Sequence, residues 1–90
     1  MNIDKTQILS NICYTELVYD RINKKLKTNF SNKEIEILML RTIEKTEINN
    51  FEKIGKNFYI SNFEKNVRIT VNSNTFRIIT VDKIKNDKRI

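Results

Sequence analysis

The sequence predicts an α+β domain in which two or three helices precede an antiparallel β-meander of three or four strands. Apolar residues recur with helical spacing in the first half, about residues 4–45. Alternating β-branched residues fill about residues 51–84, and they flank a polar step at 72–75. Ninety residues suffice for one modest core. We therefore expect a single domain whose helices pack on the apolar face of the sheet, followed by a mobile tail at 85–90.

Short helices are predicted for the first part of the chain. Asp4 is a suitable N-cap for the first helix, and Thr15 is suitable for the second. These two starts imply a break or a kink near Tyr14. The second helix is expected to end around Lys27, because lysine side chains interact favourably with the C-terminal end of a helix dipole.

A third helix has the clearest start. Ser31 and Glu34 match the capping box, in which each side chain accepts a hydrogen bond from the other residue's backbone N–H. The helix is expected to run to about Lys45. Its predicted buried residues, spaced three and four apart, are Ile35, Leu38, Met39 and Ile43.

The strand region begins at about Phe51 and contains the only glycine, Gly55, which indicates a bulge or a tight turn. Residues 66–81 then read as a hairpin. A two-residue loop there would pair Val71 with Phe76. In that register the residues pointing to the core are Val67, Ile69, Val71, Phe76 and Ile78. Those on the other face are Arg68, Thr70, Asn72, Thr75, Arg77, Ile79 and Val81.

Charge and composition restrict the class of protein. Seventeen Lys and Arg residues against eleven Asp and Glu residues give a formal charge of +6, which favours phosphate or an acidic protein surface as a partner without distinguishing them. No apolar run approaches the ~20 residues of a membrane span, and the N-terminus lacks a secretory signal. We therefore expect a cytoplasmic protein with no membrane partner.

Several classes of enzyme are disfavoured. The chain has no histidine, and its only cysteine, Cys13, excludes an intrachain disulfide and a thiolate-rich metal site. It also lacks a glycine-rich phosphate loop and a carboxylate cluster with metal-ligand spacing. Because these motifs are missing, we expect no cofactor and no metal. Any catalysis would depend on Lys, Arg, Tyr or a carboxylate, and a binding protein is therefore favoured over an enzyme.

The candidate site is the polar face of the predicted hairpin and of the strand before it. Arg68, Thr70 and Arg77 share that face in the predicted register, joined by Tyr59 or Lys56. Two guanidinium groups and an aromatic ring could hold an RNA phosphate and stack a base. The alternative interpretation is an ordinary solvent-exposed sheet face, on which Arg and Thr are common.

Five short stretches carry a resemblance to a known family: Thr15-Glu16-Leu17, Arg21-Ile22, Gly55-Lys56-Asn57-Phe58-Tyr59, Ile69-Thr70-Val71-Asn72 and Ile78-Ile79-Thr80. Together they resemble a small bacterial family of unknown function. The order of helices and strands is in turn similar to barnase-like and colicin-type ribonuclease toxins.

That second likeness implies an RNA-facing sheet. Relatives often carry histidine where this chain has Asn74 and Asp82, so histidine-dependent ribonuclease chemistry is not expected. The first functional hypothesis is accordingly a small RNA-binding domain of ribonuclease-toxin type, which a toxin–antitoxin gene pair would favour. The alternative is a phage- or mobile-element-encoded inhibitor that binds a bacterial nuclease, as anti-CRISPR proteins do. A histidine-free ribonuclease using Lys56 or Arg68 as acid and Tyr59 as base is a third hypothesis.

Overall fold

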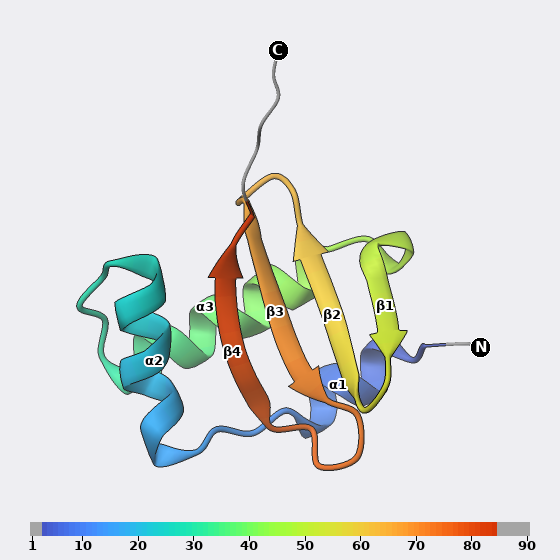
Figure 1. Ribbon diagram of the computed structural model, residues 1–90, viewed down its shortest axis with the longest axis horizontal. Helices are drawn as coiled ribbons and strands as arrows, with labels where there is room; N and C mark the ends of the chain where they lie inside the picture. The colour runs from blue at the N-terminus through green and yellow to red at the C-terminus, as the bar shows by residue number, and fades with distance from the viewer. Residues whose placement is uncertain (1–2, 85–90) are drawn as a thin grey trace.

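The computed structural model describes residues 3–84 and shows three α-helices followed by a four-stranded antiparallel sheet (Figure 1), which confirms the predicted fold class. The expected mobile tail at 85–90 lies outside the described residues. The elements in chain order are α1 (Lys5–Asn11), α2 (Glu16–Leu26), α3 (Asn32–Lys45), the 3-10 turn η1 (Ile48–Asn50), β1 (Phe51–Ile54), β2 (Asn57–Asn62), β3 (Val67–Asn72) and β4 (Ile78–Lys83).

The helices lie on one side and along one edge of the sheet. The strands are ordered β1-β2-β3-β4, so each strand pairs with its neighbour in sequence. Helix α3 crosses behind the sheet in Figure 1, and α2 lies along the outer edge of β4. The face that is turned to the viewer in Figure 1 carries no helix of the described chain, and we call it the open face.

Local hydrogen bonds explain where α1 and α3 begin, and they confirm the predicted caps Asp4 and Ser31. Thr15 occupies the N-cap position of α2, but its side chain makes no capping hydrogen bond. The side chain of Asp4 accepts a hydrogen bond from the backbone N–H of Gln7 at 3.0 Å. Ser31 and Glu34 form the complete capping box of α3. Helix α2 ends at Lys27, whose backbone is left-handed with φ = 58°. Each helix is therefore delimited by residues next to it in the sequence.

The core lies between the helices and the covered face of the sheet. Apolar side chains from all three helices meet alternate residues of the strands. Leu38, which was predicted to be buried, is only partly so. The largest fully buried members are Ile8, Ile22, Ile35, Met39 and Ile43 from the helices, and Ile60, Ile69, Val71, Ile78 and Val81 from the sheet.

The register of the last hairpin differs from the predicted one. Val71 lies opposite Ile78, and not opposite Phe76. The loop consists of the four residues 73–76, because the backbone N–H of Asn72 donates to the carbonyl of Arg77 at 2.9 Å. The prediction of a two-residue loop was therefore wrong, and β4 is paired two residues later in the chain than expected. Phe76 lies in the loop and packs only partly against the core.

The longer loop is stabilised from two sides. Oδ1 of Asn72 accepts hydrogen bonds from the backbone N–H groups of Asn74 at 2.8 Å and Thr75 at 2.9 Å. This is the local pattern by which Asn favours turns. The connection between α1 and α2 contributes as well, since the backbone N–H of Cys13 donates to the carbonyl of Phe76 at 2.9 Å.

A β-bulge changes which side chains of β4 point to the core. Thr70 lies opposite Thr80, which leaves Ile79 as an extra residue beside the Val71 end of the pairing. One extra residue moves the following side chains to the opposite face relative to a regular strand. Val81, which was predicted on the polar face, is consequently fully buried in the core.

Candidate nucleic-acid interface

The open face presents three rows of side chains that cross the sheet. Residues that are paired between neighbouring strands, and that alternate with the core residues, share this face. The central row contains Glu52, Tyr59, Thr70 and Thr80. The row toward the β2–β3 turn contains Ser61, Arg68 and Asp82, and the row at the other end contains Ile54, Asn57 and Asn72.

Tyr59 lies near the middle of the open face. It is paired with Thr70, which is 5 % exposed although it lies on this face, so neighbouring side chains cover it. The Tyr59 hydroxyl accepts a hydrogen bond from Nδ2 of Asn57 at 3.5 Å. Tyr59 itself is partly exposed, and an aromatic ring in that position can stack on a base.

Arg68 is exposed at one end of the same face. Its Nε donates a hydrogen bond to Oγ of Ser61 at 3.0 Å, which fixes the side chain over β2. Because a guanidinium group carries five N–H donors, its terminal nitrogens stay available for an anion. Arg68 and Tyr59 are diagonal neighbours on β3 and β2, with their backbones about 7–8 Å apart.

Arg77 does not lie beside Arg68, and the predicted arginine pair was wrong. Arg77 precedes β4 and forms an isolated bridge with Cys13. It is hydrogen-bonded to Asn72, which lies four residues from Arg68 along β3. Four residues of a strand span about 13 Å. The two arginines therefore lie at opposite ends of the sheet, because the loop is longer than the sequence pattern suggested.

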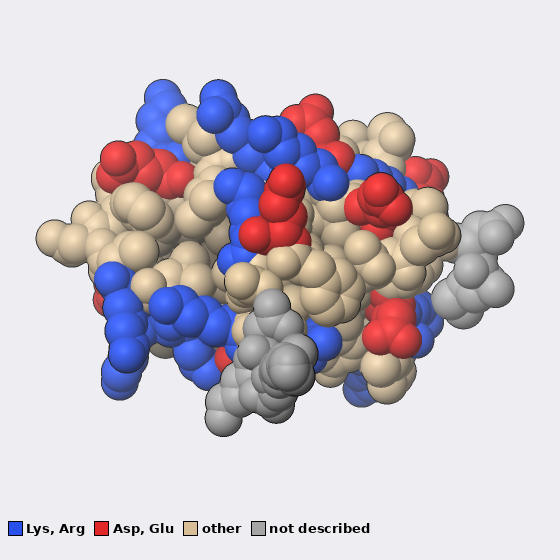
Figure 2. All heavy atoms as spheres, turned by 90° about the horizontal axis from the view of Figure 1, so that it is seen from above, with Lys and Arg blue, Asp and Glu red and all other residues tan. Residues whose placement is uncertain are grey.

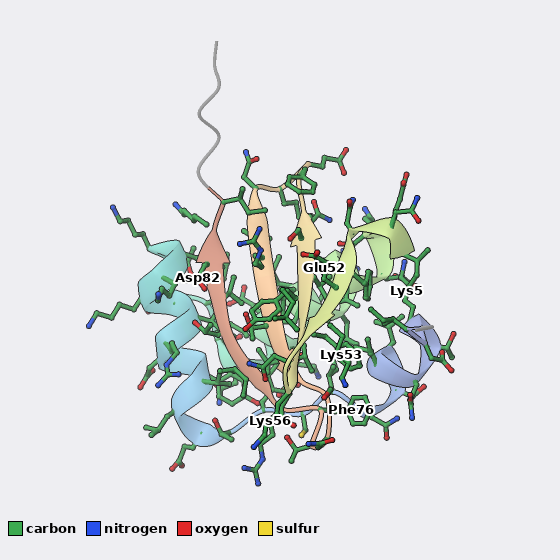
Figure 3. All side chains as sticks on the ribbon, turned by 45° about the vertical axis from the view of Figure 1, so that its right-hand side comes forward. Lys5, Glu52, Lys53, Lys56, Phe76 and Asp82 are labelled. Atoms are coloured by element: carbon green, nitrogen blue, oxygen red, sulfur yellow. The ribbon has the colours of Figure 1, made fainter. Side chains whose placement is uncertain are left out.

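Lys56 lies at the same end of the sheet as the loop that precedes Arg77. It follows Gly55, which has φ = 60°, in the turn between β1 and β2. Its backbone carbonyl accepts hydrogen bonds from the N–H of Ser73 at 2.8 Å and from Oγ of Ser73 at 2.9 Å. Figure 3 shows Lys56 near Phe76 at this end, and Asp82 toward the other. Lys56 and Arg68 thus belong to opposite ends of the open face.

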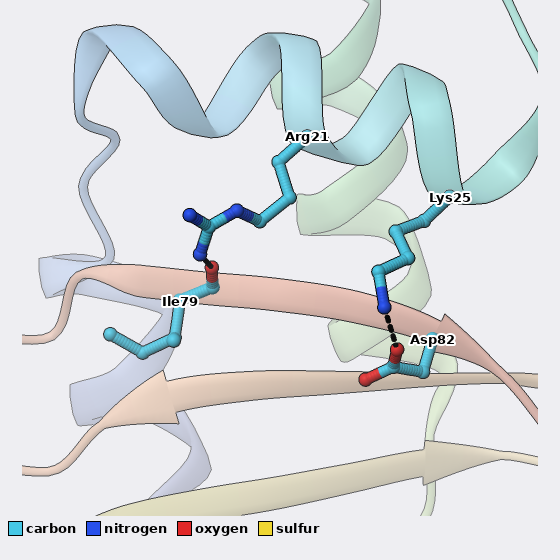
Figure 4. A network of polar contacts seen from close by, with 4 residues as sticks. All are labelled: Arg21, Lys25, Ile79 and Asp82. Carbon is cyan, nitrogen blue, oxygen red and sulfur yellow. Dashed lines mark hydrogen bonds and ion pairs between the residues drawn. The ribbon is translucent and has the colours of Figure 1, made fainter.

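Two carboxylates on the open face were not anticipated. Asp82 lies opposite Arg68, where the predicted register placed Ile79. Glu52 lies opposite Tyr59 at the edge strand. Asp82 forms an ion pair with Lys25 of α2 at 2.8 Å (Figure 4), so part of its charge is neutralised by the helix. The sequence analysis did not place Asp82 on this face, because the β-bulge that brings it opposite Arg68 has no strong local signal in the sequence.

Arg21 is a further cationic residue beside the sheet. From α2 its Nη1 donates a hydrogen bond to the backbone carbonyl of Ile79 at 3.2 Å (Figure 4). Together with Arg77 it lines a cleft of about 220 Å³. In the sequence Arg21 appeared only as part of a family motif. Nothing in its surroundings in the chain indicated that it would meet Arg77.

Basic and acidic side chains are mixed on the molecular surface. Figure 2 shows Lys and Arg gathered along one edge and at one corner of the end that it displays, with Asp and Glu among them. The formal charge of +6 is therefore not concentrated in one uniform basic face there. Binding of an anion would depend on particular residues such as Arg68 more than on a broad positive field.

The other two tyrosines form a structural cluster away from the open face. The rings of Tyr14 and Tyr19 stack with their centroids 5.5 Å apart. The Tyr19 hydroxyl donates to Oε2 of Glu36 at 2.6 Å, and this hydrogen bond, with burial, raises the pKa of Tyr19 to about 12. Burial, followed by the nearby Glu36 charge, raises the pKa of Tyr14 as well. Both tyrosines therefore stay protonated at pH values at which an exposed tyrosine ionises.

Among residues 3–84 no three His, Cys, Asp or Glu side chains are grouped so that they could hold a metal ion. In the same part of the chain, no helix has the length and apolar character that crossing a bilayer requires.

The fold and the site define a small basic α+β domain with an open, largely polar sheet face. The chain belongs to a family of proteins of unknown function, DUF3781, which matches residues 6–82. This confirms the expected resemblance to an uncharacterised family. No curated protein and no solved structure matches the chain, so the likeness to ribonuclease toxins has no support from these comparisons.

Proposed function

We propose that this protein binds single-stranded RNA on the open face of its sheet. The observation that carries the proposal is a sheet face that no described helix covers, with Tyr59 near its middle and Arg68 beside it. An aromatic ring offers a stacking surface for a base, and a guanidinium group binds a phosphate through two parallel hydrogen bonds. The hydroxyl group of Ser61 holds Arg68 in place for this role.

Positive charge at both ends of the face supports a path along the strands. Arg68 lies at one end, and Lys56 and Arg77 lie at the other, beyond Asn72. The intervening length of about 13 Å is enough for a few nucleotides of a single strand. RNA is chosen over DNA because of the sequence resemblance to ribonuclease toxins, which the comparison with solved structures does not support. The chain's lack of histidine favours binding without histidine-dependent catalysis.

Salt dependence of RNA binding tests the phosphate contact. A fluorescently labelled single-stranded RNA is titrated with the protein at several salt concentrations, and the affinity is measured by anisotropy. We expect Arg68→Ala to weaken binding and to reduce the slope of log K against log salt by about 0.7, the contribution of one phosphate contact. Arg41→Ala is the matched control, because Arg41 is exposed on α3 on the other side of the sheet.

Tyr59→Ala tests the stacking contact separately. Loss of one base–aromatic stack is expected to cost about 1–3 kcal/mol of binding free energy, with little change in the salt slope. Phe63→Ala is the control, because Phe63 is an exposed aromatic residue in the β2–β3 turn. Absence of RNA binding at low salt would overturn the proposal. Equal effects of Arg68→Ala and Arg41→Ala would overturn the assignment to the open face.

A second candidate is an inhibitor that binds a bacterial nuclease through protein–protein contacts. Exposed apolar residues near α3 favour it: Phe30 and Ile37 are 38 % and 43 % exposed and line a cleft of about 280 Å³ with Arg41 and Lys65. Clustered exposed apolar residues commonly mark protein interfaces. Such a protein would have no affinity for bare RNA, and Ile37→Glu would abolish its binding to the nuclease while Arg68→Ala would not.

A further inference from the structure

We propose that the cleft between α2 and the start of β4 binds a phosphate group through the guanidinium groups of Arg21 and Arg77. The inference rests on the proposed function for its preferred ligand, a backbone phosphate of single-stranded RNA. Inorganic phosphate or a mononucleotide carries the same chemistry and is the second source of ligand. The cleft lies beside the open face, at the end opposite Arg68.

The two guanidinium groups come from elements that are far apart in the sequence. Arg21 extends from α2, and Arg77 lies just before β4, where Cys13 bonds to the residues on either side of it. The carbonyl of Phe76 accepts from the N–H of Cys13 at 2.9 Å, and the carbonyl of Cys13 accepts from the N–H of Ile78 at 3.0 Å. The backbone that carries Arg77 is therefore fixed, although its side chain is exposed.

Within the part of the chain that the structure describes, neither arginine forms an ion pair with a carboxylate. Within residues 3–84 the ion pair is between Lys25 and Asp82, and no acidic residue lines the cleft. Arg21 uses Nη1 to bond to the uncharged carbonyl of Ile79 at 3.2 Å, which orients the group and leaves other donors unused (Figure 4). Two like charges that share a small cleft repel each other, and an anion between them removes that repulsion.

The size and lining of the cleft favour a phosphate group over a whole nucleotide. Its volume of about 220 Å³ lies below the range of about 300–1,000 Å³ that is typical of sites for larger organic ligands. Aliphatic side chains of Val18 and Ile79 form part of its wall, which reduces contact with water and strengthens interactions between charges. Thr15 also lines the cleft, and its side chain makes no capping hydrogen bond.

The position of the cleft suggests how one RNA strand would use both sites. Strand β4 is two strands away from β2, so the cleft on the outer side of β4 lies at least about 10 Å to the side of the strand that carries Tyr59. A nucleotide stacked on Tyr59 would have a neighbouring phosphate within reach of either Arg68 or the cleft. The proposal thus adds a second phosphate contact to the one that the open face supplies.

Nuclear magnetic resonance tests the site directly. The backbone amide signals of Val18 and Ile79 are followed while the protein is titrated with inorganic phosphate, with acetate, and with a short single-stranded RNA. We expect phosphate to shift these signals, Arg77→Gln to abolish the shifts, and Arg77→Lys to retain part of them, because lysine keeps the charge without the planar fork. Arg41→Gln is the matched control and is expected to behave as the parent protein.

The titrations separate the two sources of ligand and the two proposals. If Arg77→Gln weakens RNA binding and lowers the slope of log K against log salt, RNA is the source of the phosphate ligand. Phosphate-induced shifts together with unchanged RNA binding in Arg77→Gln support free phosphate as the source and leave the open-face proposal intact. Phosphate-induced shifts without any RNA binding support the cleft and overturn the proposed function. No shifts, or equal shifts with acetate, as expected for a site that takes a partner's carboxylate, overturn the inference.

Discussion

The ammonium group of Lys25 lies 2.8 Å from a carboxylate oxygen of Asp82, so that α2 is joined to the last strand on the side of the open face (Figure 4). Both side chains are about half exposed, at 49 % and 46 %. An ion pair in that position gains little from Coulomb attraction, because water screens it. Its larger consequence concerns the proposed RNA binding, since Asp82 also lies opposite Arg68.

The stability contribution of this pair is predicted to be small. A double-mutant cycle with Lys25→Ala and Asp82→Asn is expected to give a coupling free energy of about 0.2–1 kcal/mol, measured by urea unfolding. The coupling is expected to fall further at high salt. A coupling well above this range would mean that the pair is less accessible to water than its exposed fractions indicate.

Asp82→Asn is expected to strengthen the proposed RNA binding, although it removes the ion pair with Lys25. Removing the carboxylate abolishes repulsion of a phosphate bound at Arg68 and frees the ammonium group of Lys25. We therefore expect tighter RNA binding and a steeper salt dependence in the anisotropy assay. Glu44→Gln, exposed on α3 on the other side of the sheet, serves as the charge-matched control. Weaker binding by Asp82→Asn would contradict a phosphate contact at Arg68.

The capping box gives an independent prediction for α3. Oγ of Ser31 accepts a hydrogen bond from the N–H of Glu34 at 3.2 Å, and Oε1 of Glu34 accepts one from the N–H of Ser31 at 2.8 Å. Ser31→Ala is expected to lower the free energy of unfolding by about 1 kcal/mol. Glu34→Gln keeps an acceptor and is expected to cost less. Equal losses from the two substitutions would indicate that the charge of Glu34 contributes as much as the hydrogen bond to Ser31.

The hairpin register predicts which apolar residue matters most. Ile78 is 1 % exposed and lies opposite Val71, so Ile78→Ala is expected to cost about 2–5 kcal/mol. Phe76 is only partly buried, in the loop, where its ring is tilted against that of Phe58 at 6.5 Å between centroids. Phe76→Ala is therefore expected to cost less than Ile78→Ala in thermal or urea unfolding. If Phe76→Ala costs more than Ile78→Ala, Phe76 is the core residue of this hairpin, as the two-residue loop predicts.

The difference between the predicted and observed hairpins has a physical cause. Helix starts at Asp4 and Ser31 were predictable because the stabilising groups are within three residues in the sequence. The loop depends on Cys13, which is remote in sequence and bonds to the carbonyl of Phe76. The bulge at Ile79 has no sequence signature of its own. Local patterns therefore predicted the strands but could not set how they are paired.

The candidate site was predictable to the extent that it depends on strand periodicity. Tyr59, Arg68 and Thr70 share the open face because side chains alternate along β2 and β3, which are regularly paired. Arg77 and Lys56 lie in connections between strands, where the alternation of side chains along a strand does not predict which face a residue joins. Arg21 reaches the sheet only through the packing of α2 on β4. Such a contact between distant segments requires the three-dimensional structure.

The contact between Tyr19 and Glu36 predicts how stability changes at high pH. Their hydrogen bond, 2.6 Å long, is the main cause that raises the pKa of Tyr19 from its ordinary value of 10.0 to about 12. Between these two values the unfolded chain releases the tyrosine proton while the folded chain keeps it. The associated stability is therefore fully present below about pH 10 and is lost as the pH rises toward about 12.

Two variants isolate this effect from the titration of lysines, which all variants share. Tyr19→Phe has no proton to lose, so its free energy of unfolding is expected to fall less steeply than that of the parent between about pH 10 and 12. Glu36→Gln removes the carboxylate that accepts the hydrogen bond, and the ultraviolet absorbance of tyrosinate is expected to show Tyr19 titrating at lower pH. Parallel stability curves for the parent and Tyr19→Phe would show that the hydrogen bond does not persist in solution.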